Sequence, residues 1–172
     1  NLMTTGEKSR SITELLGEEP DTRPIDIAPL ARSVAEGISA ERPAAQIDVD
    51  APAHATADTT FKFREAIEEL VTNAIDHSNR EAPSVEIRVR TTEDTVEARV
   101  IDDGPGIPEM DRDVLVTGQA IDDLYHGSGL GLWLVYWIVE RSDGSISVTD
   151  AEPRGTEIGI ELPRAEDARA AE

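Results

Sequence analysis

Three glycines alternate with other residues just before the most apolar stretch of the chain, in Gly127-Ser128-Gly129-Leu130-Gly131-Leu132. The seven residues that follow, from Trp133 to Val139, are all apolar or aromatic and predict a core helix. Glycines let the backbone approach a ligand closely, and the first N–H groups of a helix point toward anions. The segment therefore predicts a triphosphate loop at a helix N-terminus. The alternative is that the glycines only allow this helix to pass close beneath a sheet.

Two common phosphate-binding motifs are absent from the sequence. The glycine segment lacks the G-x-G-x-x-G spacing of dinucleotide-binding folds, and residues 122–126 before it are not a strand-like run. The sequence also contains no G-x-x-x-x-G-K-[ST] motif, which excludes a P-loop. The chain must bind phosphate in another way.

The chain is strongly acidic. It has 36 Asp and Glu against 16 Lys and Arg, a net charge of −20, which repels nucleic acid and anionic membranes. We therefore expect no nucleic-acid partner and no membrane contact by this fragment. Only Lys8 and Lys62 are lysines, and such a surface suits a cytoplasm of high salt, so an extreme halophile is the hypothesis for its source.

Length and composition favour one cytoplasmic domain with a small appendage. The 172 residues are enough for a proper core. There is no cysteine, which excludes disulfides and thiolate metal sites, and the longest apolar run, residues 130–139, is too short to span a bilayer. A longer protein could still be attached to a membrane through upstream segments.

The two ends of the sequence differ from its middle. Residues 2–16 have a weak helical pattern, and residues 18–21 have the composition of a linker. We expect residues 1–21 to be the end of an upstream helical region, although a frayed terminus is equally consistent with the pattern. Residues 22–165 are expected to fold as the domain, and residues 166–172 to be a disordered tail.

Two helices and two short strands are expected in the first half of the domain. Asp26 is a plausible N-cap for a helix over residues 27–39. Residues 46–49 and 54–57 have the pattern of short strands, and His54 is expected at the surface or a sheet edge. Asp58 is expected to cap a long helix over residues 59–78.

The long helix has an apolar arc and an adjacent polar arc. Glu69, Asn73 and Asp76 lie together on the polar arc, with Glu65 and His77 at its margins. A solvated acidic face is the simple explanation for Glu65 and Asp76. Asn73 instead offers a neutral, hard oxygen suited to Mg²⁺ that also holds phosphate oxygens and water. Glu69, one turn earlier, could position or deprotonate a water or hydroxyl beside that metal.

A predicted hairpin leads into a second candidate site. Residues 85–90 and 96–101 alternate apolar and polar residues, and Asp102-Asp103-Gly104-Pro105-Gly106 follows them. A plain tight turn would use the same residues. A carboxylate at the end of a buried strand, followed by glycines that admit a flat ligand, also suits recognition of an exocyclic amine. Asp102 could thus accept a hydrogen bond from adenine, where guanine presents a carbonyl.

The remaining segments are a lid and a second hairpin. Residues 109–126 have no strong periodicity, and their place between the expected base site and phosphate loop predicts a lid. Residues 145–149 and 156–162 alternate as strands do and predict the second hairpin.

Three stretches together resemble, in order and spacing, the N box and the two glycine boxes of the GHKL ATPases. They are residues 69–74, 102–106 and 127–132, and Gly155-Thr156 resembles the start of that family's closing strands. The resemblance covers roughly residues 22–164 and is greatest to the catalytic ATP-binding domain of sensor histidine kinases. It implies an α/β (α+β) two-layer sandwich of the Bergerat type, in which three helices cover one face of a mixed sheet.

The resemblance also implies roles for particular residues. Asn73 corresponds to the Mg²⁺ ligand and Asp102 to the carboxylate that reads adenine. Thr156 corresponds to a secondary contact in the adenine pocket. The turn under the base corresponds to Gly104 and Gly106, and the phosphate loop to Gly127, Ser128, Gly129, Leu130, Gly131 and Leu132.

This sequence departs from the family pattern at three places. Glu69 stands where many histidine kinases have asparagine. A glutamate at this place is found in some kinase subfamilies and in gyrase-like and MutL-like hydrolases, in which it is a general base. Asp76 stands where a basic residue is common, so phosphate charge must be met by Mg²⁺, the helix dipole and a group such as His77 or an arginine. The phenylalanine box of the lid has no clear equivalent after Phe63.

The function expected from the resemblance is transfer of the ATP γ-phosphoryl group to a histidine outside this fragment. None of His54, His77 and His126 is followed by Glu or Asp, as the phosphorylated histidine of these kinases is. The implied partners are histidine-bearing dimerisation helices of the same full-length protein, which is expected to be a homodimer, and a downstream response regulator. The alternatives are a serine kinase or ATP hydrolase that uses Glu69 as base, and a non-catalytic nucleotide-sensing module.

Overall fold

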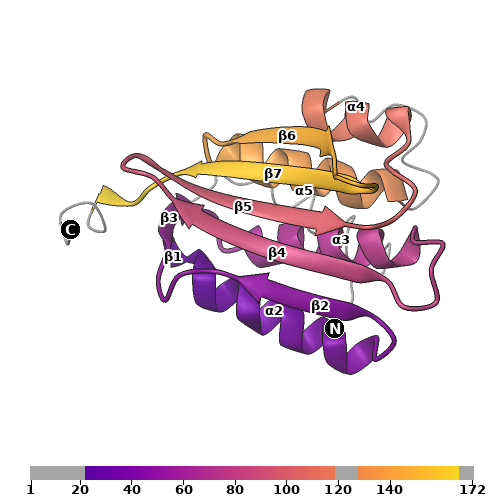
Figure 1. Cartoon of the computed structure of the whole chain (residues 1–172). Coiled ribbons are helices and arrows are strands. Elements are labelled where there is room, and N and C mark those ends of the chain that lie inside the picture. The colour runs from indigo at the N-terminus through magenta and orange to yellow at the C-terminus, as the bar shows by residue number, and fades with distance from the viewer. Residues whose placement is uncertain (1–21, 119–127, 167–172) are drawn as a thin grey trace.

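The computed structural model describes residues 22–118 and 128–166, which form a sheet and a layer of helices on one of its faces (Figure 1). In chain order the elements are β1 (Arg23–Asp26), α2 (Ile27–Glu41), β2 (Gln46–Asp50), β3 (Thr56–Thr59), α3 (Phe63–Asp76), β4 (Ser84–Thr91), β5 (Thr95–Asp102), α4 (Glu109–Thr117), α5 (Ser128–Arg141), β6 (Ser145–Asp150) and β7 (Thr156–Pro163). No helix among these is long and apolar enough to cross a membrane.

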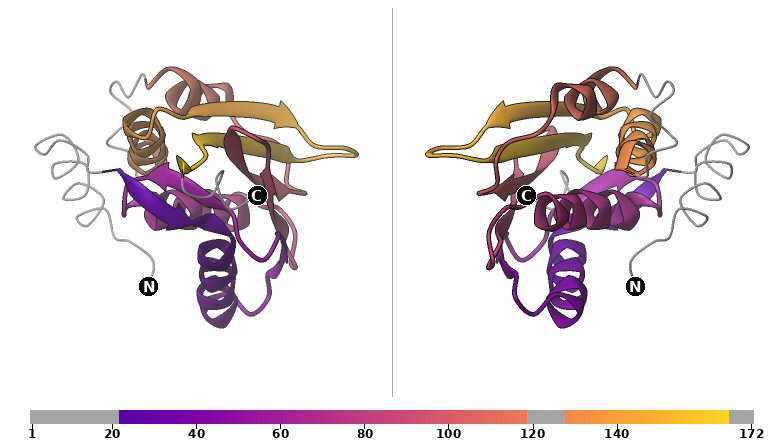
Figure 2. Two further views of the ribbon diagram at one scale, coloured as in Figure 1. Left: turned by 90° about the vertical axis from the view of Figure 1, so that its left-hand side faces the viewer. Right: turned by 90° about the vertical axis from the view of Figure 1, so that its right-hand side faces the viewer.

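The main sheet is mixed and has the strand order β2-β4-β5-β7-β6. Strand β2 runs parallel to β4, and every other neighbouring pair is antiparallel. The two expected hairpins, β4–β5 and β6–β7, are confirmed. Helices α2, α3 and α5 lie on one face of the sheet (Figure 2). Helix α4, beyond the three expected helices, packs against α5 and the edge strand β6.

The two faces of the sheet follow the alternation in the sequence. In β4, Val85, Ile87 and Val89 are fully buried against the helices. Removing each such side chain from water is worth about 1.5–3 kcal/mol, so this pattern fixes which face the helices cover. The intervening Glu86 and Arg88 point to the opposite face, where the Arg88 guanidinium donates to the Glu86 carboxylate at 2.9 Å.

Helix α3 starts later than the sequence predicts. Thr59 belongs to strand β3 and pairs with Arg23 of β1, so Asp58 is a strand residue and the expectation that it caps the helix is wrong. The helix begins at Phe63, after a turn in which the Thr60 carbonyl accepts from the Phe63 N–H at 3.1 Å. Pairing between β1 and β3 joins residues far apart in the chain, which no local helix pattern reveals.

Asp26 takes the expected N-cap position of α2 but forms no side-chain cap. One carboxylate oxygen accepts from the Ala55 N–H at 2.8 Å, and the other lies 2.7 Å from Nδ1 of His54. The Asp26 carboxylate therefore fastens the start of α2 to the residues before β3. His54 is exposed, as expected.

Residues 109–117 form a helix where the sequence shows no clear period. Glu109 and Asp111 lie in the first turn of α4, where negative charge stabilises a helix. Val114 and Leu115 are buried, and the helix ends at Gly118 with a left-handed φ of 72°. Because the buried residues of α4 are only two and are adjacent, they do not produce the helical spacing of apolar residues by which a helix is predicted from sequence. The rest of the expected lid, the helix expected within residues 2–16 and most of the tail lie outside the described residues.

Candidate functional site

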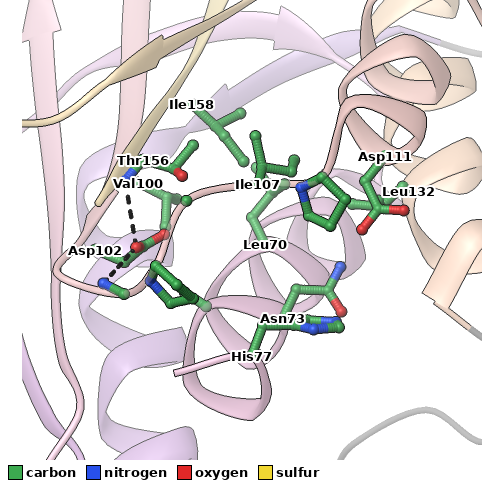
Figure 3. A pocket seen from close by; sticks show the side chains of 15 residues that line it. Leu70, Asn73, His77, Val100, Asp102, Ile107, Asp111, Leu132, Thr156 and Ile158 are labelled. Carbon is green, nitrogen blue, oxygen red and sulfur yellow. Dashed lines mark hydrogen bonds between the residues drawn. The ribbon is translucent and has the colours of Figure 1, made fainter. Parts of the chain in front are cut away.

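An open pocket lies between α3, the segment that follows β5, and strand β7 (Figure 3). Its walls are largely apolar, and they include Leu70 of α3, Val100 of β5, Leu132 of α5 and Ile158 of β7. Apolar walls with a few polar groups are typical of a site for a flat organic ligand. The polar side chains on the wall are Asn73, His77, Asp102, Asp111 and Thr156.

Asp102 stands at the end of β5 with one carboxylate oxygen already occupied. Its Oδ1 accepts hydrogen bonds from the N–H groups of Gly104 at 2.9 Å and Thr156 at 3.3 Å (Figure 3). Burial raises the pKa of this carboxyl because the ionised form loses solvation, and the two N–H donors partly oppose that shift. No hydrogen bond among the described residues engages Oδ2. The second oxygen is thus available to a ligand that donates a hydrogen bond.

Glycines shape the backbone around Asp102. Gly106 has a φ of 104°, a left-handed conformation that side chains rarely adopt. Gly155, at the end of the β6–β7 turn, has a φ of 108°, and a Cβ there would collide with the carbonyl of Asp102. The sequence draws attention to Gly104 and Gly106, whereas Gly155 is noticed only for its place before β7. Its contact with Asp102 is visible only in the fold.

Asn73 lies on the pocket wall, and Asp76 does not. The Asn73 side chain is half-buried, and among the described residues none forms a hydrogen bond with its amide. His77, one turn later, is exposed and lies beside it (Figure 3). Asp76 turns away and pairs with Arg42, whose Nη1 lies 2.6 Å from its Oδ1. The polar arc expected on α3 is therefore split, with Asn73 on the pocket wall and Asp76 on the outer surface.

Glu69 is buried behind the pocket, where α3 meets the first turn of α5. Its side chain is 4% exposed and is not among the lining residues. A Cβ on Gly131 would collide with Oε2 of Glu69. Gly131 therefore allows close approach of α5 to helix α3, whereas the alternative considered for these glycines was close approach to a sheet.

The glycine segment is described only in part. Gly127 lies outside the described residues, and α5 begins at Ser128, followed by Gly129 and Leu130. Leu132 lines the pocket. The start of α5 is therefore close to the pocket that Asn73 and Asp102 share, as a phosphate loop requires.

Several lining residues were not among the predicted site residues, and two of them, Ile107 and Asp111, belong to the segment between β5 and α4 and to α4 itself. Ile107 follows the glycine turn after β5, and Asp111 comes from the first turn of α4. The position of Ile107 directly after Gly106 was a signal that could have marked it. Asp111 could not be found, because the sequence does not predict the helix that carries it.

No compact metal cluster occurs in the part of the chain that the structure describes. No group of three or more His, Cys, Asp or Glu side chains there is placed to hold an ion. A metal at Asn73 would need most of its ligands from elsewhere. Mg²⁺ commonly keeps several waters and takes further oxygens from the phosphates of its substrate, which is compatible with a single amide oxygen.

The sequence matches a known family over most of the domain. Residues 59–166 match the family described as histidine kinase-, DNA gyrase B-, and HSP90-like ATPase. The sensor protein kinase CarS of Pseudomonas aeruginosa is 36% identical over 110 residues, which span 63% of this chain and 25% of CarS. This chain thus matches only about a quarter of that relative.

Solved structures have the same fold. The mycobacterial sensor histidine kinase MprB superposes with a TM-score of 0.69 at 25% identity, covering 84% of this chain and 98% of that structure. Full-length ShkA, solved in complex with AMPPNP, gives a TM-score of 0.74 at 24% identity, covering 94% of this chain and 35% of ShkA. The expected two-layer sandwich is confirmed, and the chain belongs to the ATPase family of histidine kinases, gyrase B and HSP90, as an ATP-binding domain of the sensor histidine kinase type.

Proposed function

We propose that the pocket binds Mg·ATP and presents the γ-phosphoryl group to a histidine side chain that is not one of the three in this sequence. One observation carries the proposal most strongly. Asp102 and Thr156 lie on one side of the pocket, Asn73 and Leu132 of α5 lie on the other, and the remaining walls are largely apolar (Figure 3). A nucleotide has the same order of parts: a base with an exocyclic amine, an apolar-faced ring and a charged phosphate chain.

The base end can select adenine. Oδ1 of Asp102 is held by the Gly104 and Thr156 N–H groups, so Oδ2 is the oxygen that accepts from the adenine amino group. Guanine presents a carbonyl at the same position, and two acceptors facing one another would repel. Val100 and Ile158 on the wall provide apolar contact for the ring.

Asn73 is the residue proposed to hold the metal. Asn73 lines the pocket, and its amide oxygen would be a ligand for Mg²⁺, which would neutralise the charge of the phosphates. The protein's own part is to fix the position of the phosphates through Asn73 and the backbone N–H groups at the start of α5. The phosphate charge must be met by these groups and Mg²⁺, because the chain is strongly acidic and Asp76 stands where the family commonly has a basic residue.

Glu69 is proposed to position the attacking group near the phosphates. Its buried carboxylate lies against Gly131, in the first turn of the helix assigned to phosphate binding. If that carboxylate orients a water molecule, the domain hydrolyses ATP. Steady phosphate release by the isolated chain that is lost in Glu69→Gln would favour this second function.

The partners follow from the proposed reaction. In this proposal the acceptor histidine belongs to dimerisation helices of the same full-length homodimer, and a response regulator takes the phosphoryl group afterwards. Sensor kinases such as CarS are the relatives that support this assignment. The cytoplasmic location is part of the same proposal, and the ends of the domain at residues 22 and 165 remain a prediction.

Calorimetric titration of the folded chain with ATP, with and without Mg²⁺, tests the nucleotide site. We expect 1:1 binding that strengthens with Mg²⁺, loss of the Mg²⁺ effect in Asn73→Ala, and loss of preference over GTP in Asp102→Asn. Unchanged Mg²⁺-dependent affinity in Asn73→Ala would overturn the metal assignment.

Phosphotransfer is tested with radiolabelled ATP and an added helical histidine domain from a relative. Tight ATP binding without transfer to any such domain would favour a nucleotide-sensing module.

A further inference from the structure

Arg154 reaches from the β6–β7 turn across the base end of the pocket. Its Nε donates to the carbonyl of Gly104 at 3.3 Å, and its Nη2 donates to Oδ1 of Asn79 at 3.2 Å. The side chain therefore joins three segments that are distant in sequence: the turn before β7, the turn after β5 and the loop after α3.

The residue that Arg154 holds is also held by Asp102. The N–H of Gly104 donates to Oδ1 of Asp102, and the carbonyl of Gly104 accepts from Arg154. Gly104 is thus fixed through both of its backbone polar groups. The Gly104 N–H gives the shorter of the two hydrogen bonds to Oδ1, the other coming from Thr156, so the orientation of Gly104 contributes to leaving Oδ2 for a ligand.

A second set of contacts fixes the neighbouring residue. Oδ1 of Asp103 accepts from the Ser84 N–H at 3.2 Å, and its Oδ2 lies 3.2 Å from Nη1 of Arg80. These contacts hold Asp103 without involving Gly104. Among the described residues, Arg154 is therefore the only side chain other than Asp102 that forms a hydrogen bond with Gly104.

We propose that Arg154 is a positioning residue for adenine recognition, acting through Gly104 on the carboxylate of Asp102. This inference rests on the proposed ATP site. Arg154 keeps the Gly104 N–H directed at Oδ1, which leaves Oδ2 turned toward the exocyclic amine. Without the guanidinium, the Gly104 turn rotates more freely, and the longer hydrogen bond from the Thr156 N–H is the one that still holds Oδ1 of Asp102. Lysine carries the charge but lacks the planar fork that reaches Gly104 and Asn79 together.

The test compares two nucleotides that differ only in the group that Asp102 reads. ATP and purine riboside triphosphate, which lacks the 6-amino group, are titrated into the wild type, Arg154→Ala, Arg154→Lys and the control Arg90→Ala. Arg90 pairs with Asp50 at the opposite end of β4, at 2.7 Å, and its loss tests the general effect of removing an exposed arginine. Circular dichroism and thermal melting establish that every variant is folded.

We expect the wild type and Arg90→Ala to prefer ATP. In Arg154→Ala this preference should fall by about three- to tenfold, the value of one hydrogen bond, while affinity for the analogue stays nearly constant. Arg154→Lys should recover part of the preference. An equal loss of affinity for both nucleotides, or an unchanged preference in Arg154→Ala, would overturn the inference. Absence of preference in the wild type would instead contradict the assignment of Asp102, so the two failures are distinguishable.

Discussion

Two helical glycines in this chain are glycine for different reasons. Gly131, in the first turn of α5, is buried, and a Cβ there would collide with Oε2 of Glu69. Gly37, in the interior of α2, is exposed, and a Cβ there would meet nothing within 4 Å. In a helix, alanine is ordinarily more favourable than glycine by about 1 kcal/mol. Opposite effects are therefore expected from the same substitution at these two sites.

Gly131→Ala should lower the free energy of unfolding by about 1–3 kcal/mol, because the added methyl group forces the Glu69 carboxylate or α5 to move. Gly37→Ala, the matched control, should raise it by about 0.5–1 kcal/mol. Urea denaturation measures both. Combining Gly131→Ala with Glu69→Ala should cost less than the sum of the single changes, because the collision is then absent. Strictly additive effects would show that the two residues do not collide.

Asp102 predicts a pH dependence of ATP binding. Burial raises the pKa of its carboxyl, and only the ionised form leaves both oxygens as acceptors. As pH falls through this raised pKa, affinity for ATP should fall, whereas Asp102→Asn should show a flat profile in that window. Titrations between the usual range of an aspartate and neutral pH measure this. A wild-type profile as flat as that of Asp102→Asn would contradict the role of the carboxylate.

The same group should affect stability in the opposite direction. Because the folded state holds this proton more tightly than the unfolded chain does, protonation of Asp102 stabilises the fold. Its contribution to the free energy of unfolding therefore declines as pH rises from the ordinary aspartate value toward the raised pKa. Binding of ATP favours ionised Asp102, and folding without nucleotide favours the protonated form.

At the scale of elements, α4 is tied to α5 at its C-terminal end. The indole N–H of Trp133 donates to the carbonyl of Gly118 at 3.1 Å. A Cβ on Gly118 would also collide with the ring of Tyr136. The contact therefore fixes the C-terminal end of α4 against α5.

Trp133→Phe should loosen α4 without disturbing the sheet. The lost hydrogen bond is worth about 0.5–1.5 kcal/mol, so amide exchange in α4 should accelerate by about two- to tenfold. Trp137→Phe is the matched control, because the buried Nε1 of Trp137 has no hydrogen-bond partner among the described residues. Hydrogen exchange followed by mass spectrometry resolves α4 from β4 and β5. Equal acceleration in both variants would mean that the Trp133 hydrogen bond does not hold α4.

The sequence predicts well those elements whose formation depends on residues close together in the chain. Strands β4, β5, β6 and β7 alternate with period two, and short turns join them in pairs, so pattern alone identifies both hairpins. The start of α3 depends instead on β1 pairing with β3, a contact between residues thirty or more positions apart. The local helix propensity of Asp58 and Thr59 carries no information about pairing with β1, so it cannot show that these residues form a strand.

The site shows the same division. Asn73, Asp102 and Thr156 lie around one pocket because each occupies a fixed place on a strand or helix whose pattern is strong. Glu69 has the same helical periodicity as Asn73, yet it is buried beside Gly131. The position of Glu69 depends on how closely α5 approaches α3. The sequence does not determine this distance, because the glycines at the start of α5 are consistent both with a phosphate loop and with a packing contact. Arg154 contacts Gly104 and Asn79, which lie far from it in the chain, so no local sequence pattern marks it as a residue of the site.

At the scale of the whole molecule, the excess of negative charge is not neutralised within the fold. Arginines such as Arg42, Arg88 and Arg99 are already paired with carboxylates. Further carboxylates are exposed and form no ion pair with another described residue; among them are Glu36, Glu81, Glu93 and Glu161. Repulsion among such groups opposes the compact state. We propose that the acidic surface is an adaptation to high salt, as the composition suggests.

This proposal predicts a melting temperature that rises with potassium chloride. Between about 0.1 M and 1 M salt the screening length falls from about 10 Å to about 3 Å, which removes most repulsion between exposed carboxylates. For a chain of this size, a rise on the order of 5 °C corresponds to a gain of 1–2 kcal/mol. Exchanging Glu36, Glu81, Glu93 and Glu161 for lysine reduces the net charge from −20 to −12, because each exchange removes one negative charge and adds one positive charge.

That four-lysine variant should melt higher than the wild type at low salt and gain less from added salt. Differential scanning calorimetry at several KCl concentrations measures both. The matched control changes the same four residues to aspartate, which keeps the charge and the exposure, and it should retain the salt response of the wild type. If the lysine and aspartate variants respond to salt alike, repulsion between surface carboxylates is not what opposes folding, and the acidic composition requires another explanation.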